Sequence, residues 1–420
     1  MRRVLFLLGA ALIIVNLPFA LEAQAPAAKE VTFSRDVAPI LYSNCIYCHR
    51  PNDIAPFSLL SYKDARPWSK SMKEQVVMRR MPPWGVDPHV GDFRNNKSLS
   101  ERDIQTIAAW VDGGAKEGNA ADMPKMPQFD EGWQIGTPDL VVKMTEPYKI
   151  PATGTVPYVT LPTDYVFPED TWVQAVEVKP GNRAVVHHAM TQLGETGSVS
   201  DGPHMYSPGI EAMIWRDGYG KLIPKGTRVY LQLHYNVIGK ETTDQTSIAF
   251  KFAKVPVHTE VHQPMSPNQS LLIPPMVQGH EVVTAFVFPT EARLHAFRPH
   301  MHVRGANVSV TLVMPDGKRR PMFNLPKWDD SWQYFYMLQE TATVPKGAFL
   351  EVVANFDNSP ANPLNPDPKS PVAWGQQVWE EMLNFYPVWT AVNDANRNDT
   401  APIQIPPSKL FTTGVAAGRN

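Results

Sequence analysis

The spacing of apolar residues predicts a short helical part at the start of the chain and a long strand-rich part after it. Within residues 99–115, apolar side chains recur at three- and four-residue intervals, the pattern of an amphipathic helix. This stripe consists of Ile104, Ile107, Ala108 and Val111. We expect Ser100 to cap the start of the helix, and Gly113 or Gly114 to end it.

Beyond residue 139 the apolar residues recur at intervals of two. Short alternating runs are separated by Pro, Gly, Asn and Asp, which is typical of antiparallel β-sandwiches. The segments 223–236 and 344–358 both carry a Pro-Lys-Gly turn that leads into a strand, a weak internal repeat. The predicted fold is therefore multidomain, a small all-α domain followed by two antiparallel β-sandwiches. Its predicted parts are a helical domain over 26–120, a linker over 121–138, and sandwiches over 139–265 and 266–420.

The first 25 residues have the layout of a secretory signal peptide. Two arginines precede an apolar run over residues 4–21, and small residues follow it. The run is almost long enough to span a bilayer, so an uncleaved membrane anchor is the alternative. Asn16 and Pro18 interrupt the run and favour cleavage. We therefore expect a periplasmic or secreted protein that is not inserted in the membrane once the signal is removed.

The composition is that of an ordinary globular protein, with 43% hydrophobic and 19% charged residues over 420 positions. The formal net charge of −2 argues against a general affinity for nucleic acid or for anionic membranes. Forty-one prolines favour a structure rich in strands and loops over one of long helices.

The only two cysteines, Cys45 and Cys48, precede His49 in a Cys-x-x-Cys-His sequence. This is the attachment sequence of c-type haem, in which both sulfurs bind the porphyrin and the histidine is an axial ligand. A disulfide between the cysteines is the alternative. The preceding segment is predicted to be helical, with Ser34 or Asp36 as its cap. Haem of this type is attached outside the cytoplasm, in agreement with the predicted export.

Electron transfer by such a haem calls for a second axial ligand, and a thioether raises the reduction potential. Met81, which two prolines follow in a loop, is our choice. Met72 and Met78 lie in a predicted helix and are assigned to packing. With these features residues 30–117 resemble a small class I cytochrome c, and one covalently attached haem c is expected.

A first set of candidate metal ligands consists of three histidines. His187 and His188 are adjacent, and His234 follows in the segment Leu-Gln-Leu-His-Tyr. Neighbours in a regular strand point to opposite faces, so joint ligation by the first two requires a β-bulge or a strand end.

A second set combines two histidines and a methionine. His300 and His302 are two residues apart in the segment 297–305, so they share one strand face with Arg298. Met382 begins a later segment with the same period of two. Imidazole and thioether without thiolate or carboxylate suit copper, because soft sulfur favours Cu(I) and imidazole serves both oxidation states. Zinc more usually recruits carboxylate or thiolate. The sequence therefore predicts two copper ions.

In this order, the four segments resemble the copper type II, ascorbate-dependent monooxygenases, the peptidylglycine α-hydroxylating and dopamine β-monooxygenase group. The resemblance covers about residues 130–400 and implies two jelly-roll-like sandwiches with one copper each across a water-filled cleft. His187, His188 and His234 match the ligands of the electron-storing copper. His300, His302 and Met382 match those of the copper that binds oxygen.

The resemblance also implies a site for a substrate carboxylate. In the peptidylglycine branch an Arg before the His-x-His pair, and an Asn and a Tyr after the Met, hold that group. Arg298, Asn384 and Tyr386 stand at the matching positions. The alternative interpretation of this trio is ordinary strand polarity facing solvent. Two departures are clear, since this chain has no cysteines for the family's disulfides and carries a haem sequence that the family lacks.

These features predict an exported copper monooxygenase that hydroxylates a C–H bond of a small substrate with O₂. A periplasmic electron donor would supply electrons through the haem to the first copper. A copper- and haem-binding electron-transfer protein without hydroxylase activity is the alternative. A carbohydrate-binding or adhesive sandwich would explain the fold but none of the predicted ligands.

Overall fold

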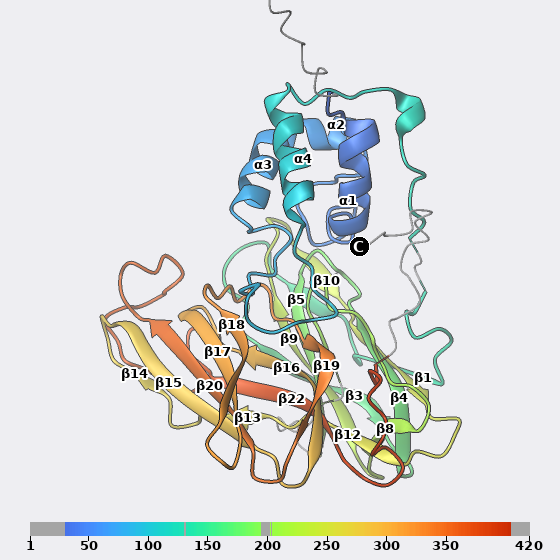
Figure 1. Cartoon of the computed structure of the whole chain (residues 1–420), viewed down its shortest axis with the longest axis vertical. Helices are drawn as coiled ribbons and strands as arrows, with labels where there is room; N and C mark the ends of the chain where they lie inside the picture. Colours follow the sequence, from blue (N-terminus) through green and yellow to red (C-terminus); the bar gives the residue numbers. More distant parts are fainter. Residues whose placement is uncertain (1–29, 130–131, 195–201, 203, 405–420) are drawn as a thin grey trace, which may run out of the picture.

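The computed structural model describes residues 30–129, 132–194, 202 and 204–404, and Figure 1 shows helices above a much larger body of strands. The described chain is mostly β-structure with few helices, which is compatible with β-sandwich domains. The predicted signal peptide, residues 1–25, lies outside the described residues. No helix among the described residues has the length and apolar character needed to cross a membrane.

The helices form a group with an apolar core of its own. They are η1 (Phe33–Val37), α1 (Ala38–Asn44), α2 (Tyr62–Ala65), η2 (Arg66–Trp68), α3 (Ser69–Val77), α4 (Glu101–Asp112) and η3 (Ala120–Asp122). Phe33, Leu41 and Trp110 are at most 1% exposed in this core. It is separate from the core that the strands enclose.

Helix α4 begins and ends where the sequence predicts. The Ser100 side chain accepts a hydrogen bond from the Asp103 backbone, and Gly113 follows the last helical residue. Its buried face is slightly rotated from the predicted stripe, because Trp110 is buried beside Ile104 and Ile107. Ala108 and Val111 are only half-buried. The large indole thus takes the central position that the stripe assigned to smaller side chains.

Two details of the other helices differ from the sequence predictions. The first helical turn begins after Thr32, so Ser34 and Asp36 lie inside it, and the Asp36 carboxylate accepts a hydrogen bond from the Thr32 backbone. Met72 is buried as predicted, but Met78 is 54% exposed. The packing role assigned to Met78 is therefore wrong, because α3 ends at Val77 and leaves the next side chain in solvent.

The strands form one long sheet and two four-stranded sheets (Figure 1). The long sheet has the order β1 (Leu140–Lys143), β11 (Ser247–Phe252), β4 (Thr171–Lys179), β8 (Tyr219–Ile223), β12 (Thr259–His262), β22 (Asn384–Ala391), β16 (Ala292–His300) and β19 (Tyr336–Val344). In it β7 (Met213–Ile214) also pairs with β4, and β13 (Ser266–Pro267) with β22.

One four-stranded sheet has the order β3 (Val159–Val166), β9 (Arg228–Tyr235), β5 (Val186–Gly194) and β6 (Met205–Tyr206). The other has the order β15 (Gln278–Val287), β20 (Phe349–Asp357), β17 (Gly305–Val313) and β18 (Arg319–Leu325). Two short pairs are β10 (Thr242–Asp244) with β2 (Tyr148–Ile150), and β14 (Leu272–Ile273) with β21 (Val372–Ala373).

Each four-stranded sheet contacts a different half of the long sheet. Strands β3 and β6 contact β1 and β4, while β15 contacts β13 and β22. Nearly all pairings are antiparallel, but β12 pairs with β8 in parallel and with β22 in antiparallel orientation. Through β12 the long sheet continues across the predicted boundary at residue 265, and one apolar core extends through both halves. The division into two sandwiches therefore stays a prediction.

The segment between α3 and α4 leaves the helical group and packs on the strands (Figure 1). Trp84 and Phe93 are 7% and 6% exposed and belong to the core of the strand region. The Phe93 ring contacts the rings of Phe297, Phe323 and Tyr336. The sequence placed this segment in the helical domain, but its aromatic side chains are buried against β16, β18 and β19.

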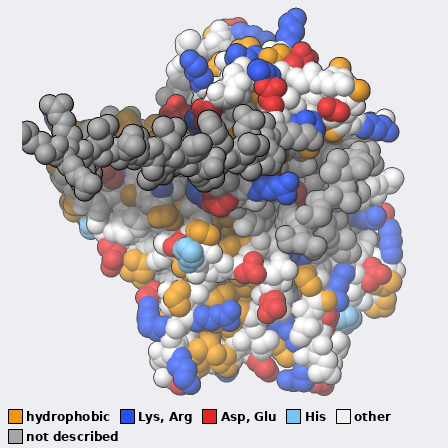
Figure 2. All heavy atoms as spheres, turned by 45° about the horizontal axis from the view of Figure 1, so that its top comes forward, with side chains coloured by type: hydrophobic (Ala, Val, Ile, Leu, Met, Phe, Trp, Pro, Cys, Tyr) orange, Lys and Arg blue, Asp and Glu red, His pale blue; other side chains and the backbone are white. Residues whose placement is uncertain are grey.

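Part of the predicted linker also packs on a sheet. Ile135 is 4% exposed and belongs to the same apolar cluster as Ala175 on β4. The Glu177 carboxylate accepts hydrogen bonds from the Gln134 and Ile135 backbone at 2.6 and 3.4 Å. Residues 133–135 are thus a fixed part of the fold. On the face that Figure 2 shows, basic and acidic side chains are interspersed over the described surface, as the net charge of −2 leads one to expect.

Candidate metal centre

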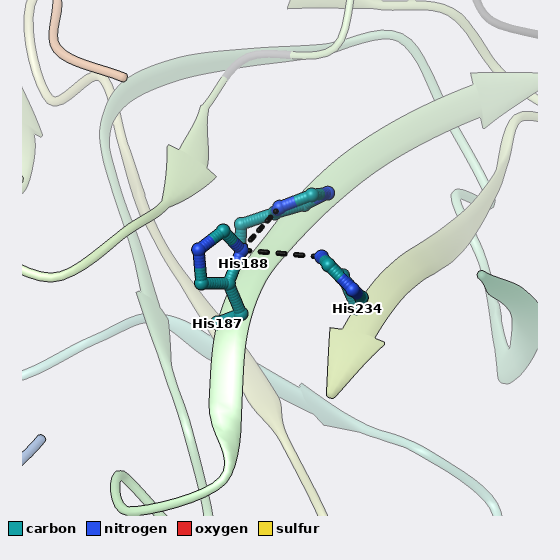
Figure 3. Close-up of side chains that lie close together, drawn as sticks. All are labelled: His187, His188 and His234. Atoms are coloured by element: carbon teal, nitrogen blue, oxygen red, sulfur yellow. Dashed lines mark hydrogen bonds between the residues drawn. The ribbon is translucent and has the colours of Figure 1, made fainter. Parts of the chain in front are cut away.

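The first set of histidines lies on two paired strands. His188 on β5 stands opposite His234 on β9, and the pairing register shifts between Val186 and His188. His187 is therefore the extra residue of a β-bulge, the feature that joint ligation by two adjacent histidines requires. The bulge turns the two neighbouring imidazoles to the same side (Figure 3).

The three imidazoles present their Nδ1 atoms to one another (Figure 3). The Nδ1 of His187 lies 3.3 Å from that of His188 and 3.1 Å from that of His234. Ligand atoms of all three residues lie within 4.8 Å of one another. Three converging imidazole nitrogens are a donor set suited to copper or zinc.

Burial keeps these imidazoles neutral near pH 7. It lowers the pKa of His187 to about 4 and that of His234 to about 3. The pKa of His188 is lowered well below its usual value by burial and by the neighbouring histidines. A neutral imidazole is the form that binds a metal ion, so the set needs no deprotonation at pH 7.

The second set lies where β16 and β22 pair, in the part of the long sheet beyond β12. His300 on β16 stands opposite Asn384 on β22. His302 follows the end of β16, and its ring centroid lies 5.1 Å from that of His300. Met382 precedes β22, and its sulfur accepts a hydrogen bond from the Asn384 amide at 3.0 Å. The structure thus brings both imidazoles and the predicted thioether to one place.

Hydrogen bonds orient the two rings of the second set. The Nδ1 of His300 lies 2.5 Å from the Gln333 side-chain oxygen, and the Nδ1 of His302 lies 3.2 Å from the Glu380 carbonyl oxygen. These acceptors fix the proton on Nδ1 and leave Nε2 as the free donor atom, as in most metal-bound histidines. The Nε2 of His302 is buried and has no hydrogen-bond partner among the described residues. Such an orphaned nitrogen fits a metal ligand.

One small cavity is lined by all three residues of the second set and by one histidine of the first set. His188, His300, His302 and Met382 contribute to its wall, and its volume is about 10 Å³, room for about one water. The Tyr158 ring lies between the sets, with centroids 4.4 Å from His234 and 5.7 Å from His302. The wide water-filled cleft implied by the family resemblance is therefore not what these residues form, because Tyr158 occupies the space between them.

The three candidate substrate residues are buried near this cavity. Arg298, Asn384 and Tyr386 are 2%, 1% and 8% exposed, so the alternative that they face solvent is wrong. The Arg298 guanidinium lies 4.0 Å above the Tyr386 ring and 5.6 Å from the Phe335 ring centroid. Its Nε and one Nη have no hydrogen-bond partner within the described structure. A buried guanidinium with unused N–H groups is suited to hold a carboxylate.

The haem sequence lies at the end of α1, where Cys45 and Cys48 are both free thiols. The Nδ1 of His49 lies 3.2 Å from the Phe57 carbonyl oxygen, which leaves Nε2 available to an iron. Burial raises the pKa of Cys48 to about 12, against a lowering effect of Arg183. Two unpaired thiols beside an oriented imidazole fit covalent haem attachment.

Met81 lies after α3 on the wall of a different cavity. That cavity has a volume of about 710 Å³ and is lined by Trp84, Leu99 and Ile104 among others. Cys45, Cys48 and His49 are not among its lining residues. The structure thus gathers the predicted copper ligands, whereas Met81 lines a cavity that His49 does not line.

Sequence reasoning missed Glu381, which ties the two parts of the second set together. Its carboxylate is 0% exposed and accepts hydrogen bonds from the backbone of His302, Arg304 and Met382 at 2.8, 2.6 and 3.0 Å. It thereby joins the turn after β16 to the loop before β22. Its place directly before Met382 was the only available signal, since its partners are distant in sequence. Tyr158 was also missed, because no local pattern marks its contacts with the histidines.

Comparison with known proteins does not assign the chain to a family. No protein-family model matches the chain, and no curated protein matches it. Among solved structures, the chain is similar to the major capsid protein P2 of bacteriophage PM2, with 8% identity and a TM-score of 0.27 over 61% of this chain and 98% of that one. It is also similar to the infectious bursal disease virus VP2 subviral particle protein (8% identity, TM-score 0.19, 64% and 76% coverage) and to an oxalate decarboxylase (9%, 0.14, 62% and 78%). TM-scores this low do not define a common fold.

Proposed function

We propose that this chain is an exported copper-dependent monooxygenase that hydroxylates a C–H bond of a small substrate, with electrons relayed through a c-type haem. The observation that carries the proposal is the gathering of six predicted ligands from distant segments into two donor sets beside one cavity. The motif resemblance to the copper type II, ascorbate-dependent monooxygenases supports the same assignment. The proposal includes a cytochrome-like helical domain and two jelly-roll-like sandwiches.

The proposed reaction consumes O₂ and two electrons beyond those of the substrate bond. A substrate R–H, O₂, two electrons and two protons give R–OH and water. When bound, copper supplies one-electron redox chemistry at each set and the capacity to activate O₂. Two sets with one electron each match the two electrons required.

The residues of the second set have separate roles in this proposal. His300 and His302 present Nε2, and Met382 presents a soft sulfur that favours the reduced metal. The Gln333 and Glu380 oxygens orient the two rings. Arg298 holds an anionic group of the substrate, and its stacking on Tyr386 fixes the guanidinium plane.

The position of the haem sequence supports electron delivery to the first set. The charge of Arg183 is one of three, after those of Lys97 and Arg50, that lower the pKa of the Cys48 thiol, and Arg183 lies 5.9 Å from the Tyr206 ring centroid. Tyr206 on β6 pairs with Ala189 on β5, the residue after His188. The haem sequence therefore lies within range of the charge of Arg183, which precedes strand β5 of the first set. The electron donor itself is proposed to be a periplasmic reductant or cytochrome.

A test of this function measures O₂ uptake and product together. Protein exported with its haem and loaded with copper should consume O₂ in the presence of ascorbate and a panel of small carboxylates and peptides. Mass spectrometry with ¹⁸O₂ should then find one labelled oxygen atom in a product. Haem- and copper-loaded protein that produces no labelled product from any compound would refute the monooxygenase.

The cavity gives one observation in favour of the second candidate, an electron-transfer protein. Its volume of about 10 Å³ holds a water but no organic substrate in this conformation. An electron-transfer protein would exchange electrons between haem and copper without any labelled product. The ¹⁸O₂ experiment therefore separates the two functions.

A further inference from the structure

A second small cavity shares no lining residue with the cavity of the two ligand sets. Its volume is about 10 Å³, room for about one water or one small ion. Apolar side chains of β7, β16, β19 and β22 form much of its wall. The wall also contains five side chains that carry polar atoms: Arg94, Trp215, His295, Thr341 and Gln404. The proposed function makes no use of this cavity.

His295 is the extra residue of a β-bulge in β16. The pairing register with β19 and with β22 shifts between Leu294 and Ala296 in both cases. A bulge takes one side chain out of the regular alternation of a strand. The imidazole is 8% exposed, and its Nε2 lies 2.9 Å from the Thr390 hydroxyl. Its Nδ1 is buried and has no hydrogen-bond partner among the described residues, so a further binding partner is missing.

The Trp215 indole carries a second unused polar group. The side chain is 0% exposed, and its Nε1 has no hydrogen-bond partner within the described part of the chain. Its backbone is fixed, because Trp215 forms an antiparallel bridge with Gln404 and donates its N–H to the Gln174 carbonyl oxygen at 2.9 Å. An indole N–H can only donate a hydrogen bond. The missing partner must therefore be an acceptor.

Arg94 brings a positive charge to the cavity without a carboxylate. Its half-buried guanidinium donates hydrogen bonds to the backbone and side-chain oxygens of Gln404 at 2.9 and 3.2 Å, and to the Met337 sulfur at 3.6 Å. These acceptors are neutral, and Arg94 forms no ion pair with any described residue. Burial lowers the pKa of Arg94, and the charge of Glu211 acts in the opposite direction. An arginine side chain stays charged in proteins, and buried charges are normally paired.

Positive charge is in excess around the cavity. Burial, followed by the charges of Arg293, Arg94 and Arg216, lowers the pKa of His295 to about 3, so the imidazole is neutral at pH 7. The Arg293 guanidinium donates to three backbone carbonyl oxygens of the turn after β22. Arg216 forms an ion pair with Asp399. Of these three guanidinium groups, one has a carboxylate partner among the described residues.

We propose that this cavity binds one chloride ion, held by the Trp215 indole N–H, the His295 Nδ1–H and the charge of Arg94. When the Thr390 hydroxyl donates to Nε2, the proton of the neutral imidazole lies on Nδ1 and makes it a donor. Donors and an unpaired positive charge suit an anion. A water would need acceptors for its two hydrogens, whereas the Gln404 oxygens already accept from Arg94 and no carboxylate lines the cavity. The inference is independent of the proposed function.

The test exchanges the full chain into sodium gluconate and then replaces gluconate by chloride at constant ionic strength. A ligand that binds only the folded state stabilises it, so the midpoint of thermal unfolding should rise with chloride and then level off. Bromide should act in the same way, whereas sulfate, which is too large for the cavity, should not. Crystals grown in sodium bromide should show one anomalous peak beside the Trp215 Nε1 and the His295 Nδ1.

Matched variants make the result specific to this cavity. Trp215→Phe keeps the ring but removes the N–H, and Arg94→Met removes the charge, so each should need at least tenfold more chloride for half of the effect. Trp389 is also buried with an unpartnered Nε1 among the described residues, but it does not line the cavity. Trp389→Phe should therefore keep the wild-type response. Equal responses of Trp215→Phe and Trp389→Phe, or no bromide peak in the cavity, would refute the chloride site and leave the proposed function untouched.

Discussion

The cavity between the two ligand sets is lined by three methionines, Met190, Met265 and Met382. Only Met382 was singled out from the sequence, because it shares its period with Asn384 and Tyr386. The hydrogen bond from the Asn384 amide to its sulfur orients that side chain. Variants of these three methionines can therefore be compared to find which sulfur binds copper.

We predict that Met382→Ala removes the copper–sulfur contact of the reduced protein, as seen by X-ray absorption. Met265→Ala should keep that contact, although it removes a thioether from the same cavity wall. Truncation of the buried Met382 should also cost about 2–5 kcal/mol of stability, and that of the half-buried Met265 less. Loss of the sulfur signal in Met265→Ala, with retention in Met382→Ala, would contradict the ligand assignment.

At the residue scale, the ligand types were predictable but their surroundings were not. The period of two in the segment 297–305 led to His300 and His302, since strand pleating alone aligns such residues. The bulge at His187 could only be stated as a requirement, because a register shift depends on the partner strand. Glu381 and Tyr158 act through residues far away in sequence, so no local pattern reveals them.

At the level of elements, the contact between residues 133–135 and β4 depends on one titratable group, the Glu177 carboxyl. Burial raises the pKa of Glu177 to about 7, although the Gln134 and Ile135 backbone N–H groups lower it. The ordinary value is 4.5, so between about pH 4.5 and 7 the folded state binds a proton that the unfolded chain releases. Stability from this group is therefore present at low pH and lost as the pH rises through that window.

We predict that Glu177→Gln raises the free energy of unfolding above that of the wild type at pH 8, and does so less at pH 5. The amide oxygen still accepts the backbone hydrogen bonds, and no buried charge forms. From about 1.4 kcal/mol per pKa unit, the gain at pH 8 should be at most about 3 kcal/mol. Urea unfolding of both proteins at the two pH values measures it, with the exposed Glu340→Gln as a control. An equal difference at both pH values would contradict the assignment.

The segment between α3 and α4 joins the helical group to the strands through Trp84 and Phe93. We predict that Phe93→Ala costs about 3–5 kcal/mol and exposes residues 78–98 to proteases, because the ring fills a pocket among three other aromatic rings. Val77→Ala, at an exposed position of α3, should change neither property. Limited proteolysis at matched temperatures tests this, and equal cleavage rates in the two variants would refute the joining role.

At the element scale, the sequence led to the correct limits of α4 and to a strand-rich region beyond residue 139. Local signals suffice there, since a serine cap and a following glycine are contained in a few residues. The packing of Trp84 on the strands was not predictable from the sequence, because an apolar ring can be buried equally well against helices or against strands. The sheet that continues through β12 depends likewise on pairings of residues far apart in sequence.

Considered as a whole, the molecule contains the haem sequence and both predicted ligand sets, which the proposed function connects. The charge of Arg183, just before β5, acts on the Cys48 thiol of the haem sequence, and Tyr158 lies between the first set and the second. Under the proposed function, electrons would pass from the haem to the first set and then to the second.

The central claim is that two separate copper ions are bound, one by each set. Metal analysis of the exported, haem-containing protein tests it most directly. We predict two copper atoms per haem iron, and one in His234→Ala, which removes a ligand of the first set only. A wild-type protein that binds no copper, or a His234→Ala variant that still binds two, would contradict it.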